Sequence, residues 1–337
     1  MNIDFLKVCS DVTKTARKIP QSQYLSSGQY PIFDQGQKTI SGYYNDAGNI
    51  ANDFPYIVFG DHTRVLKYVN EPCYIGADGV KLLKIINNDF VPKYVFYALL
   101  ANPVNSQGYS RHFKFLKEKK IKIASKKEQH FIIEKLDSIK KSIELKENEL
   151  KSLDELVKSR FIEMFGHYFE DVRYFVKVGD IATATIGLTY KPDNVTDEGI
   201  IVLRSGNIQN AELCLSDDIV RVSNIRIKED KFVRENDILM CSRNGSARLV
   251  GKCCLIPKLN EQMSYGAFMT VIRSKYPYFL NGFFNSTYFL QQLTGTQTAS
   301  VNQITTGMLN SYTVIKPSDT EENEFAEFVK LIDKIMI

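Results

Sequence analysis

The sequence lacks several features that would point to particular classes of protein. Its 337 residues include no tryptophan and only four histidines, and the histidines show no metal-ligand spacing. No apolar run approaches the ~18 residues that a membrane span needs, and the first residues lack the apolar core of a secretory signal. The six cysteines form no CxxC pair, which disfavours a zinc ribbon or a disulfide framework. We therefore expect a cytoplasmic protein with reduced thiols, no metal and no membrane contact.

The common catalytic motifs are absent as well. The sequence has no GxxxxGK[ST] phosphate loop, no HExxH zinc motif and no GxSxG nucleophile elbow. Residues 101–105 (ANPVN) faintly resemble the Asn-Pro-Pro-aromatic loop of adenine methyltransferases, but the second proline and the aromatic residue are missing. Because nothing in the sequence indicates a reaction, we expect a chain that is not an enzyme by itself and that holds no cofactor.

The composition is that of a globular protein, and its charge is unevenly distributed. Hydrophobic residues make up 44% and charged residues 24%, and the length suits two domains. The net charge of +4 is too small to identify a partner. However, basic residues outnumber acidic ones in 1–125 and in 166–318, whereas 126–165 is balanced and 319–337 is acidic. Because the two globular blocks are the basic parts, the distribution favours a polyanion as partner.

A change in composition marks the middle of the chain. Residues 109–165 contain neither glycine nor proline, although both recur on either side. This pattern predicts a strand at 120–124 and a long helix over 126–165, with Ser125 and Glu128 as a capping box at its start. At ~1.5 Å per residue, such a helix is a rod of roughly 60 Å.

The expected helix carries an apolar seam on one face and charges of both signs on the others, a pattern typical of a coiled coil. The seam positions are Leu136, Ile139, Ile143, Leu150, Leu153 and Val157. The C-terminal residues offer a shorter matching strip, formed by Phe325, Phe328 and Ile332. This second helix would cover less than half of the first, so either another chain covers the remaining seam or the sequence is truncated. The alternative is a core helix packed on one of the domains.

The two blocks that flank the long helix look like a degenerate repeat. Strand-like segments, polar turns and a helix follow in the same order, with 55–61, 73–85 and 91–100 in the first block and 236–252, 263–274 and 282–292 in the second. In this alignment Gly79 and Gly266 occupy equivalent places. A period this long indicates a duplicated domain plus helix rather than a solenoid.

These observations predict an α+β fold class, with two mixed α/β domains separated by long coiled-coil spacer helices in a pseudo-two-fold repeat. The expected bounds are 1–125 for the first domain, 126–166 for the central spacer helix, 167–318 for the second domain and 319–337 for the short distal helix.

Polar loops at matching positions of both blocks carry side chains suited to nucleic acid. Arg can bond guanine and Asn or Gln can bond adenine in the major groove, while Ser, Thr and Lys hold phosphates. Any single one can instead be a solvated turn residue, so the prediction depends on recurrence in both halves. In the first block we predict DNA contacts for Gln35, Gln37, Lys38, His62, Thr63, Arg64, Lys67, Arg111, His112 and Lys114. In the second we predict them for Arg204, Asn207, Ser242, Arg243, Asn244, Arg248, Lys252, Ser300, Asn302 and Gln303.

Several of these segments resemble a known family over nearly the whole chain. The segments YPIFDQGQKTISGYY (30–44), PYIVFGDHTRVLKYV (55–69) and CYIGADGVKLL (73–83) resemble a target-recognition domain of type I restriction-modification specificity (S) subunits. The segment 126–166, which ends in RFIEMFG, resembles the central spacer helix of that family. The segment NDILMCSRNGSARLVGK (236–252) resembles the second recognition domain.

The resemblance implies a non-catalytic DNA-recognition subunit. Each recognition domain would read one half of a bipartite double-stranded DNA target, and the spacer helices would dock methyltransferase (modification) subunits, two in number. S-adenosylmethionine, ATP and Mg would bind only on partner subunits, which include a restriction (motor-nuclease) subunit. A second S chain is a further partner if the helical bundle needs completion. Two alternatives stay open: the recognition half of a type II-like restriction/methylation system, and a decoy or scaffold that sequesters modification subunits.

Overall fold

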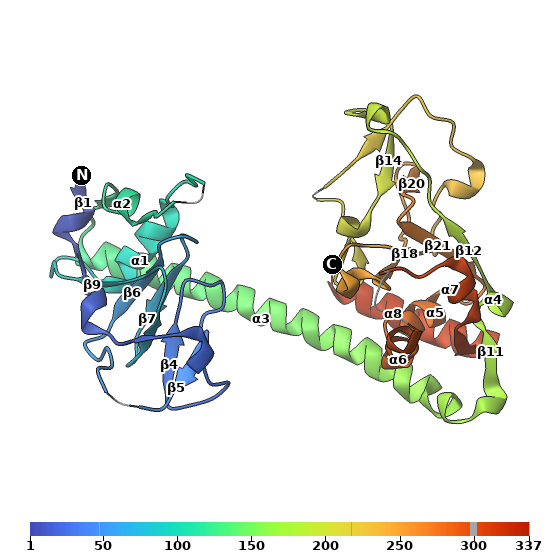
Figure 1. Ribbon diagram of the computed structural model, residues 1–337, viewed down its shortest axis with the longest axis horizontal. Helices are drawn as coiled ribbons and strands as arrows, with labels where there is room; N and C mark the ends of the chain where they lie inside the picture. Colours follow the sequence, from blue (N-terminus) through green and yellow to red (C-terminus); the bar gives the residue numbers. More distant parts are fainter. Residues whose placement is uncertain (47, 109, 217, 297–301, 337) are drawn as a thin grey trace. The chain divides into compact units, whose positions relative to one another are not determined.

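The computed structural model describes residues 1–46, 48–108, 110–216, 218–296 and 302–336 (Figure 1). The chain divides into two compact parts, unit 1 (Met1–Leu145) and unit 2 (Lys146–Ile337). The helix α3 (Lys126–Phe165) runs from one unit into the other, which confirms the predicted long helix. Its capping box is also confirmed, because the Ser125 N–H donates to Glu128 Oε2 at 2.8 Å and Ser125 Oγ accepts the N–H of Glu128 at 3.3 Å.

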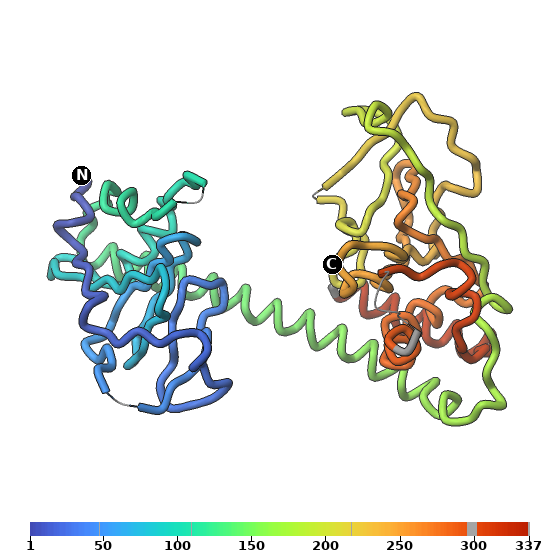
Figure 2. The backbone as a smooth tube through the Cα atoms, viewed as in Figure 1, coloured from blue at the N-terminus to red at the C-terminus, as the bar shows by residue number. Residues whose placement is uncertain are grey.

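Within its described residues, unit 1 has two four-stranded sheets and, besides the first part of α3, two short α-helices. The first sheet is antiparallel, in the order β2 (Cys9–Asp11), β9 (Val80–Ile85), β6 (Tyr56–Gly60) and β7 (Leu66–Val69). In the second, β8 (Tyr74–Gly76) is parallel to β3 (Lys18–Ile19) and to β4 (Tyr30–Phe33), and β4 is antiparallel to β5 (Gly42–Tyr44). The remaining elements are α1 (Pro92–Ala101), α2 (Phe113–Leu116) and the pair β1 (Asn2–Asp4) with β10 (Lys120–Lys122), which places the N-terminus beside the segment that leads into α3 (Figure 2).

Two cores lie on the two faces of β6, which is buried at every position. Because alternate side chains of a strand point to opposite faces, Ile57 and Phe59 pack in a core with Val95 of α1, whereas Val58 packs in a second core with Leu82. The first turns of α3 pack on the first of these cores through partly buried isoleucines.

Unit 2 repeats this plan with additional elements. Its antiparallel sheet has the order β12 (Ala182–Ile186), β21 (Met269–Ser274), β18 (Ile238–Cys241) and β19 (Cys253–Leu255). Its second sheet has the order β13 (Val195–Thr196), β17 (Arg221–Val222), β14 (Ile200–Leu203) and β20 (Met263–Tyr265), with β14 and β20 parallel. Two further pairs are β11 (Phe175–Lys177) with β22 (Thr313–Ile315) and β15 (Ile208–Gln209) with β16 (Glu212–Leu213). The helices of this unit are α4 (Val178–Ile181), α5 (Pro277–Phe284), α6 (Thr287–Thr296), α7 (Thr306–Ser311) and α8 (Asp319–Met336).

The predicted repeat is confirmed strand by strand. The order β2-β9-β6-β7 in unit 1 corresponds to β12-β21-β18-β19 in unit 2, and the parallel pair β4·β8 corresponds to β14·β20. The helix that follows the sheet was expected over 282–292, but the structure has two helices there, α5 and α6. Helices α1 and α5 both begin with a proline, a residue that suits the first helical position.

The strand register shows that the expected equivalence of Gly79 and Gly266 is wrong. Gly76 pairs with Ile19 and Gly266 pairs with Leu188, in parallel in both cases, so Gly266 corresponds to Gly76. The carbonyl of Gly79 accepts the N–H of the residue after β6, and the carbonyl of Phe268 accepts the N–H of the residue after β18. Phe268 is therefore the counterpart of Gly79, because the connection in unit 2 is one residue shorter.

The last turns of α3 belong to the core of unit 2. The rings of Phe161 and Phe165 are buried, and each lies 5.7 Å from the ring of Phe325 in α8. Arg160 pairs with Glu324, and its guanidinium lies 5.9 Å from the ring of Phe328. The structure thus brings part of the predicted strip on α8 against α3 and buries it in a domain core.

The middle of the predicted seam has no cover in the described part of the chain. Ile143 and Leu150 are 54% and 44% exposed, and Ile139 is exposed as well. Leu136, Leu153 and Val157 are half-buried, and Ile332 of α8 is buried. The alternative of a core helix is therefore correct only for the ends of α3. Among the described residues, no helix combines the length and the apolar character that a membrane crossing requires.

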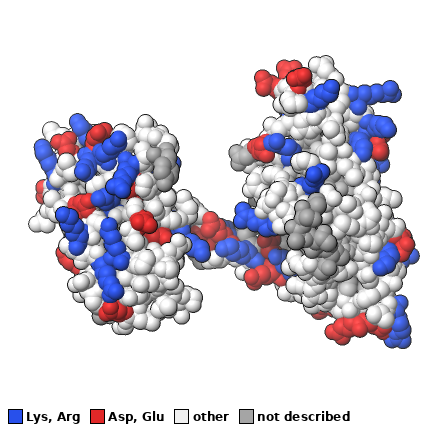
Figure 3. Space-filling view, in the orientation of Figure 1, with Lys and Arg blue, Asp and Glu red and all other residues white. Residues whose placement is uncertain are grey.

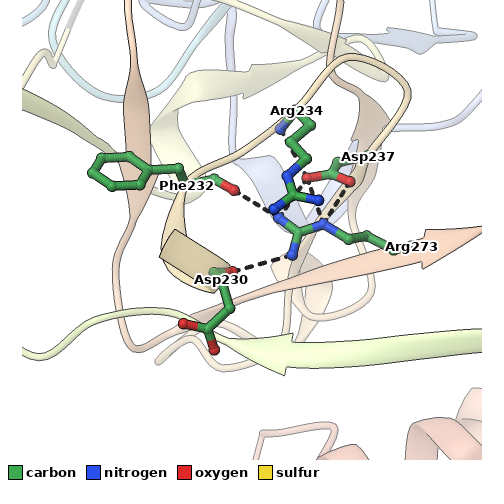
Figure 4. A network of polar contacts seen from close by, with 5 residues as sticks. All are labelled: Asp230, Phe232, Arg234, Asp237 and Arg273. Atoms are coloured by element: carbon green, nitrogen blue, oxygen red, sulfur yellow. Dashed lines mark hydrogen bonds and ion pairs between the residues drawn. The ribbon is translucent and has the colours of Figure 1, made fainter. Parts of the chain in front are cut away.

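A buried ion pair fixes the chain before β18 in unit 2 (Figure 4). Arg273 of β21 donates from Nε to Asp237 Oδ1 at 2.9 Å and from Nη2 to the carbonyl of Phe232 at 2.6 Å. Asp237 is only 5% exposed, and its Oδ2 also accepts the N–H of Arg234 at 2.9 Å. Hydrogen bonds of this number and geometry compensate the cost of burying both charges.

Candidate nucleic-acid interface

In unit 1, four loops meet at the end of β6, and Asp61 holds them together. Its N–H donates to the carbonyl of Gly79 at 2.6 Å, and its carbonyl accepts the N–H of His112 at 2.8 Å. Its buried carboxylate accepts the N–H of Phe113 at 2.7 Å, at the start of α2. Asp61 was not predicted as a site residue, although an acidic residue directly after a buried strand is a sequence signal for such a role.

The loop that follows β4 packs on the same place. Gln35 Oε1 accepts the N–H of His62 at 3.3 Å, and the hydroxyl of Thr63 donates to the carbonyl of Gln35 at 2.5 Å. Arg64 has a left-handed backbone with φ of 64°, and its guanidinium donates to the carbonyl of Val104 at 3.4 Å. The predicted residues whose side chains are exposed around this junction are Gln37, Lys38, Thr63, Arg64, Arg111 and Lys114.

Unit 2 assembles its loops in the same way at the end of β18. The N–H groups of Ser242 and Arg243 both donate to the carbonyl of Phe268 at 3.0 Å, and the carbonyl of Ser242 accepts the N–H of Ile304 at 2.7 Å. Asn244 Nδ2 donates to Ser205 Oγ at 3.1 Å. The predicted residues Arg243 and Arg248 are exposed, and Arg204, Asn244, Lys252, Asn302 and Gln303 are half-buried. The predicted Ser300 lies outside the described residues.

Four predicted contact residues are buried, and we reassign them from DNA contact to support of the loops. In unit 1 these are Lys67 and His112. Lys67 pairs with Asp34 Oδ1 at 3.4 Å. The His112 ring donates from Nδ1 to the Asp61 carbonyl at 3.0 Å and accepts at Nε2 from the N–H of Gln107 at 3.2 Å, so a neutral ring satisfies both partners.

The other two buried residues are in unit 2. Asn207 Oδ1 accepts the N–H of Arg204 at 2.9 Å, which closes the turn after β14. The hydroxyl of Ser242 donates to the carbonyl of Phe268 at 3.1 Å, in addition to the backbone bonds at that atom. Because the polar atoms of these side chains are already engaged inside the protein, their burial removes them from a DNA-facing surface.

The pair Lys67 and Asp34 shows how burial and charge act together. Burial lowers the pKa of Lys67, and the neighbouring carboxylate opposes this effect. Burial also acts to raise the pKa of Asp34, but hydrogen bonds from Ser41 and Gly36 and the charge of Lys67 outweigh it, so the pKa of Asp34 lies below its ordinary value. The carboxylate that organises this loop therefore stays ionised at neutral pH.

A cavity of about 420 Å³ opens beside the loops of unit 2, lined among others by Tyr190, Arg204 and Phe268. Arg204 pairs with Asp218, while its Nε is buried without a partner in the described part of the chain. The guanidinium of Arg243 lies 5.4 Å from the centre of the Phe268 ring. Tyr190 and Phe268 were not predicted, since an aromatic residue in a polar loop gives no distinct sequence signal.

The side chains in the described residues provide binding groups and no recognisable catalytic centre. No cluster of three or more His, Cys, Asp or Glu side chains suited to a metal lies within them. Burial raises the pKa of Cys9, Cys73 and Cys254 to about 12, which keeps these thiols protonated. By contrast, Lys and Arg side chains gather on the face of unit 1 that Figure 3 shows. An arrangement of this kind suits an anionic surface.

Comparisons with known proteins agree with the resemblance in the sequence. Residues 4–155 match the family model described as the type I restriction modification DNA specificity domain. The StySPI specificity subunit of Salmonella potsdam is 26% identical over 158 residues, and so is the EcoKI specificity subunit of Escherichia coli K12. These matches cover 44% of this chain and 34% of either relative, so the match spans about a third of the length of these relatives.

Solved structures extend the likeness in fold to the whole chain. The S subunit of a type I restriction-modification system from M. genitalium is similar with a TM-score of 0.60 at 14% identity, over 100% of this chain and 90% of that one. A chain from a structural study of complex assembly in the type I R-M system has a TM-score of 0.50, also at 14% identity, over 99% of this chain and 90% of that one. Residues 4–155 are therefore similar to the type I restriction modification DNA specificity domain, and the chain as a whole is similar in fold to a type I restriction-modification S subunit.

Proposed function

We propose that this chain recognises double-stranded DNA for a type I restriction-modification complex and reads a bipartite target, one half with each unit. The observation that carries this proposal is the repeated junction of loops at the ends of β6 and β18. In both junctions the residue after the central strand makes the same two backbone bonds, and both loops that follow that strand expose an arginine, Arg64 in one and Arg243 in the other.

The exposed residues suit two different tasks at a DNA surface. Lysine and threonine side chains such as Lys38, Lys114 and Thr63 would hold phosphates and set the register. Arginines and amides such as Arg64, Arg243 and Asn302 would bond base edges, and each good bidentate pair contributes ~1–3 kcal/mol of discrimination. Because α3 links the two units in one chain, two weak half-site contacts would combine into one specific site through their effective concentration.

The chain itself would supply recognition and no chemistry. Modification subunits would dock on the exposed apolar side chains of α3, including Ile139, Ile143 and Leu150, because such a strip needs cover in an assembled complex. We propose two such subunits, which would bring S-adenosylmethionine and methylate adenine, and a restriction subunit, which would bring ATP and Mg. We propose no cofactor for this chain.

The test is reconstitution with type I modification subunits from the same organism. The purified complex should methylate adenine only within one bipartite sequence, and modification subunits without this chain should show no sequence preference. A gel-shift titration over a range of salt would measure the phosphate contribution through its slope. Methyl transfer by this chain alone, or methylation without sequence preference in its presence, would contradict the proposal.

A further inference from the structure

The two loop junctions differ at one matched backbone position, Gly79 in unit 1 and Phe268 in unit 2. Both carbonyls accept the N–H of the residue that follows the central strand, Asp61 or Ser242. The two positions therefore have the same place in the backbone hydrogen bonding of their units, and Phe268 carries a side chain there that Gly79 lacks. Any contact that this side chain makes with DNA belongs to unit 2 alone.

Unit 1 has no room for a side chain at this position. Gly79 has a φ of +59°, which side-chain-bearing residues rarely adopt. A Cβ built on it would lie 2.7 Å from Gln35 Oε1 and 2.8 Å from His62 Cδ2. Gln35 and His62 therefore occupy the space that a side chain would need, and unit 1 presents polar groups there.

In unit 2 the Phe268 ring is exposed to solvent on a backbone that is held in place. It is 58% exposed, although its carbonyl is held by Ser242 and Arg243, with both backbone distances at 3.0 Å. The Arg243 guanidinium lies 5.4 Å from the ring centre, within the range of a cation–π contact. Phe268 and Arg243 thus form a pre-organised pair, and groups held in place before binding lose less entropy on binding.

The chemistry of this pair selects among the base edges of DNA. A phenyl ring offers no hydrogen bond, and in the major groove the apolar group of a base edge is the C5 methyl of thymine. A neighbouring arginine bonds O6 and N7 of guanine. We infer that Phe268 contacts a thymine methyl group in the half-site of unit 2, next to a guanine that is bonded by Arg243. This inference rests on the proposed function and adds the base type and the two residues that select it.

The test replaces thymine by deoxyuridine, which removes the methyl group alone. The reconstituted complex would be titrated with target DNA that carries uracil in one half-site, then in the other. Wild-type protein should bind about fourfold more weakly when uracil is in the half-site of unit 2, the effect of one buried methyl group. Phe268→Ala should bind thymine and uracil DNA equally.

A matched control variant is Phe131→Ala. Phe131 is 59% exposed and has the ammonium of Lys135 at 5.5 Å from its ring, but it lies on α3. This variant should still bind thymine DNA about fourfold more tightly than uracil DNA. Arg243→Ala should lose preference for guanine at the adjacent position.

The outcomes separate this inference from the proposed function. If the wild-type complex shows no sequence preference, the result contradicts the proposed function itself. If it binds specifically but uracil has no effect in either half-site, or if Phe268→Ala keeps the fourfold ratio, the inference is overturned. A Phe268→Ala variant that weakens binding to thymine and uracil DNA alike, with no uracil effect in the wild type, would also overturn it, because it would indicate a ring wedged between bases.

Discussion

Helix α1 in unit 1 and helix α5 in unit 2 begin at equivalent places. A buried side chain from the first turn of α3 caps α1, and one from the first turn of α8 caps α5. In unit 1, Gln129 Oε1 accepts the N–H of Val91 at 2.7 Å, and Nε2 donates to the carbonyls of Asp89 and Ala124, both at 2.8 Å. In unit 2, Glu322 accepts two backbone N–H groups of α5, both at 2.9 Å. The same scaffold is therefore closed by a neutral amide in one unit and by an ionisable carboxyl group in the other.

A second pair of positions differs in burial. Arg273 of β21 and Lys84 of β9 lie at matching places in the two sheets, each opposite the first strand of its sheet. Arg273 holds the buried Asp237, whereas Lys84 pairs with Asp53, whose side chain is 86% exposed. The comparison teaches that the units share backbone bonds and differ in how deeply their charges are buried, so equivalent substitutions should have unequal effects.

The largest expected effect comes from Arg273→Ala. Removal of the guanidinium leaves the carboxylate of Asp237 buried and unpaired, which should destabilise unit 2 by about 3–5 kcal/mol. The matched variant Lys84→Ala should lower the stability of unit 1 by about 1 kcal/mol or less, since exposed pairs contribute little. Denaturant unfolding of both variants would measure the difference. Equal losses of stability in the two variants would contradict this expected difference between the units.

The next effect concerns the helix caps. Gln129→Glu removes the donor that serves two carbonyls, so it should lower the stability of unit 1 by about 1–3 kcal/mol. Glu322→Gln keeps an acceptor for one of the two N–H groups of α5 and loses the other, because each oxygen of Glu322 accepts one of them. It should therefore have a smaller effect than a change that affects two hydrogen bonds and adds a buried charge. Unfolding by denaturant at pH 7 checks both variants, and a larger loss in Glu322→Gln would contradict this ranking.

The same caps should give the units different responses to pH. Burial raises the pKa of Glu322, and the hydrogen bonds from Phe279 and Tyr278 only partly oppose it. Because the folded-state pKa lies above the ordinary value of 4.5, the folded form binds the proton more tightly. This stabilisation is fully present below pH ~4.5 and is lost as the pH rises through the raised pKa. As the pH rises through this range, the free energy of unfolding should fall more steeply in the wild type than in Glu322→Gln. Parallel curves would contradict the assignment.

A smaller effect should separate exposed from buried lysines at the interface. Lys38→Ala removes an exposed charge and should reduce the salt slope of DNA binding by about 0.9, the value for one phosphate contact. Lys67→Met replaces a buried lysine that is paired with Asp34, and it should leave the salt slope unchanged while it lowers stability. A reduced slope in Lys67→Met would show that Lys67 contacts DNA after all.

The smallest effect on folding should come from the exposed seam. Ile143→Glu changes an exposed side chain in the middle of α3, so stability should change by no more than about 0.5 kcal/mol. Binding of modification subunits should nevertheless be lost, because the charge enters the proposed docking surface. Size-exclusion chromatography of the mixed subunits measures assembly, with Lys140→Glu on the same helix as control. Normal assembly with Ile143→Glu would contradict the proposal that modification subunits dock on this part of α3.

The long helix and the repeat could be predicted from the sequence because their signals are local and strong. The lack of glycine and proline and the pairing of Ser125 with Glu128 define α3 without any tertiary information. The same capping geometry recurs at α8, where the Ser318 N–H donates to Glu321 Oε2 at 2.8 Å. The sequence order of strand-like segments likewise follows from short runs of β-branched and aromatic residues, which are a local signal.

The details that failed depend on contacts between distant segments. Gly79 was paired with the wrong glycine because a one-residue difference in a short connection is visible only in the strand register. Lys67 lies on a strand where Val69, two residues later, faces the core, so its burial had a sequence signal that its charge obscured. His112 and Asn207 gave no such signal, because their partners are backbone groups brought together by the fold.

The most direct test of the account is the set of methylated adenines in host DNA for the wild type, Arg64→Ala and Arg243→Ala. Each arginine is exposed in the loop that follows the central strand of one unit, so each substitution should relax one half of the bipartite sequence and leave the other half unchanged. Methylation patterns that stay identical in all three strains, or a single substitution that relaxes both halves together, would contradict the claim that each unit reads its own half-site.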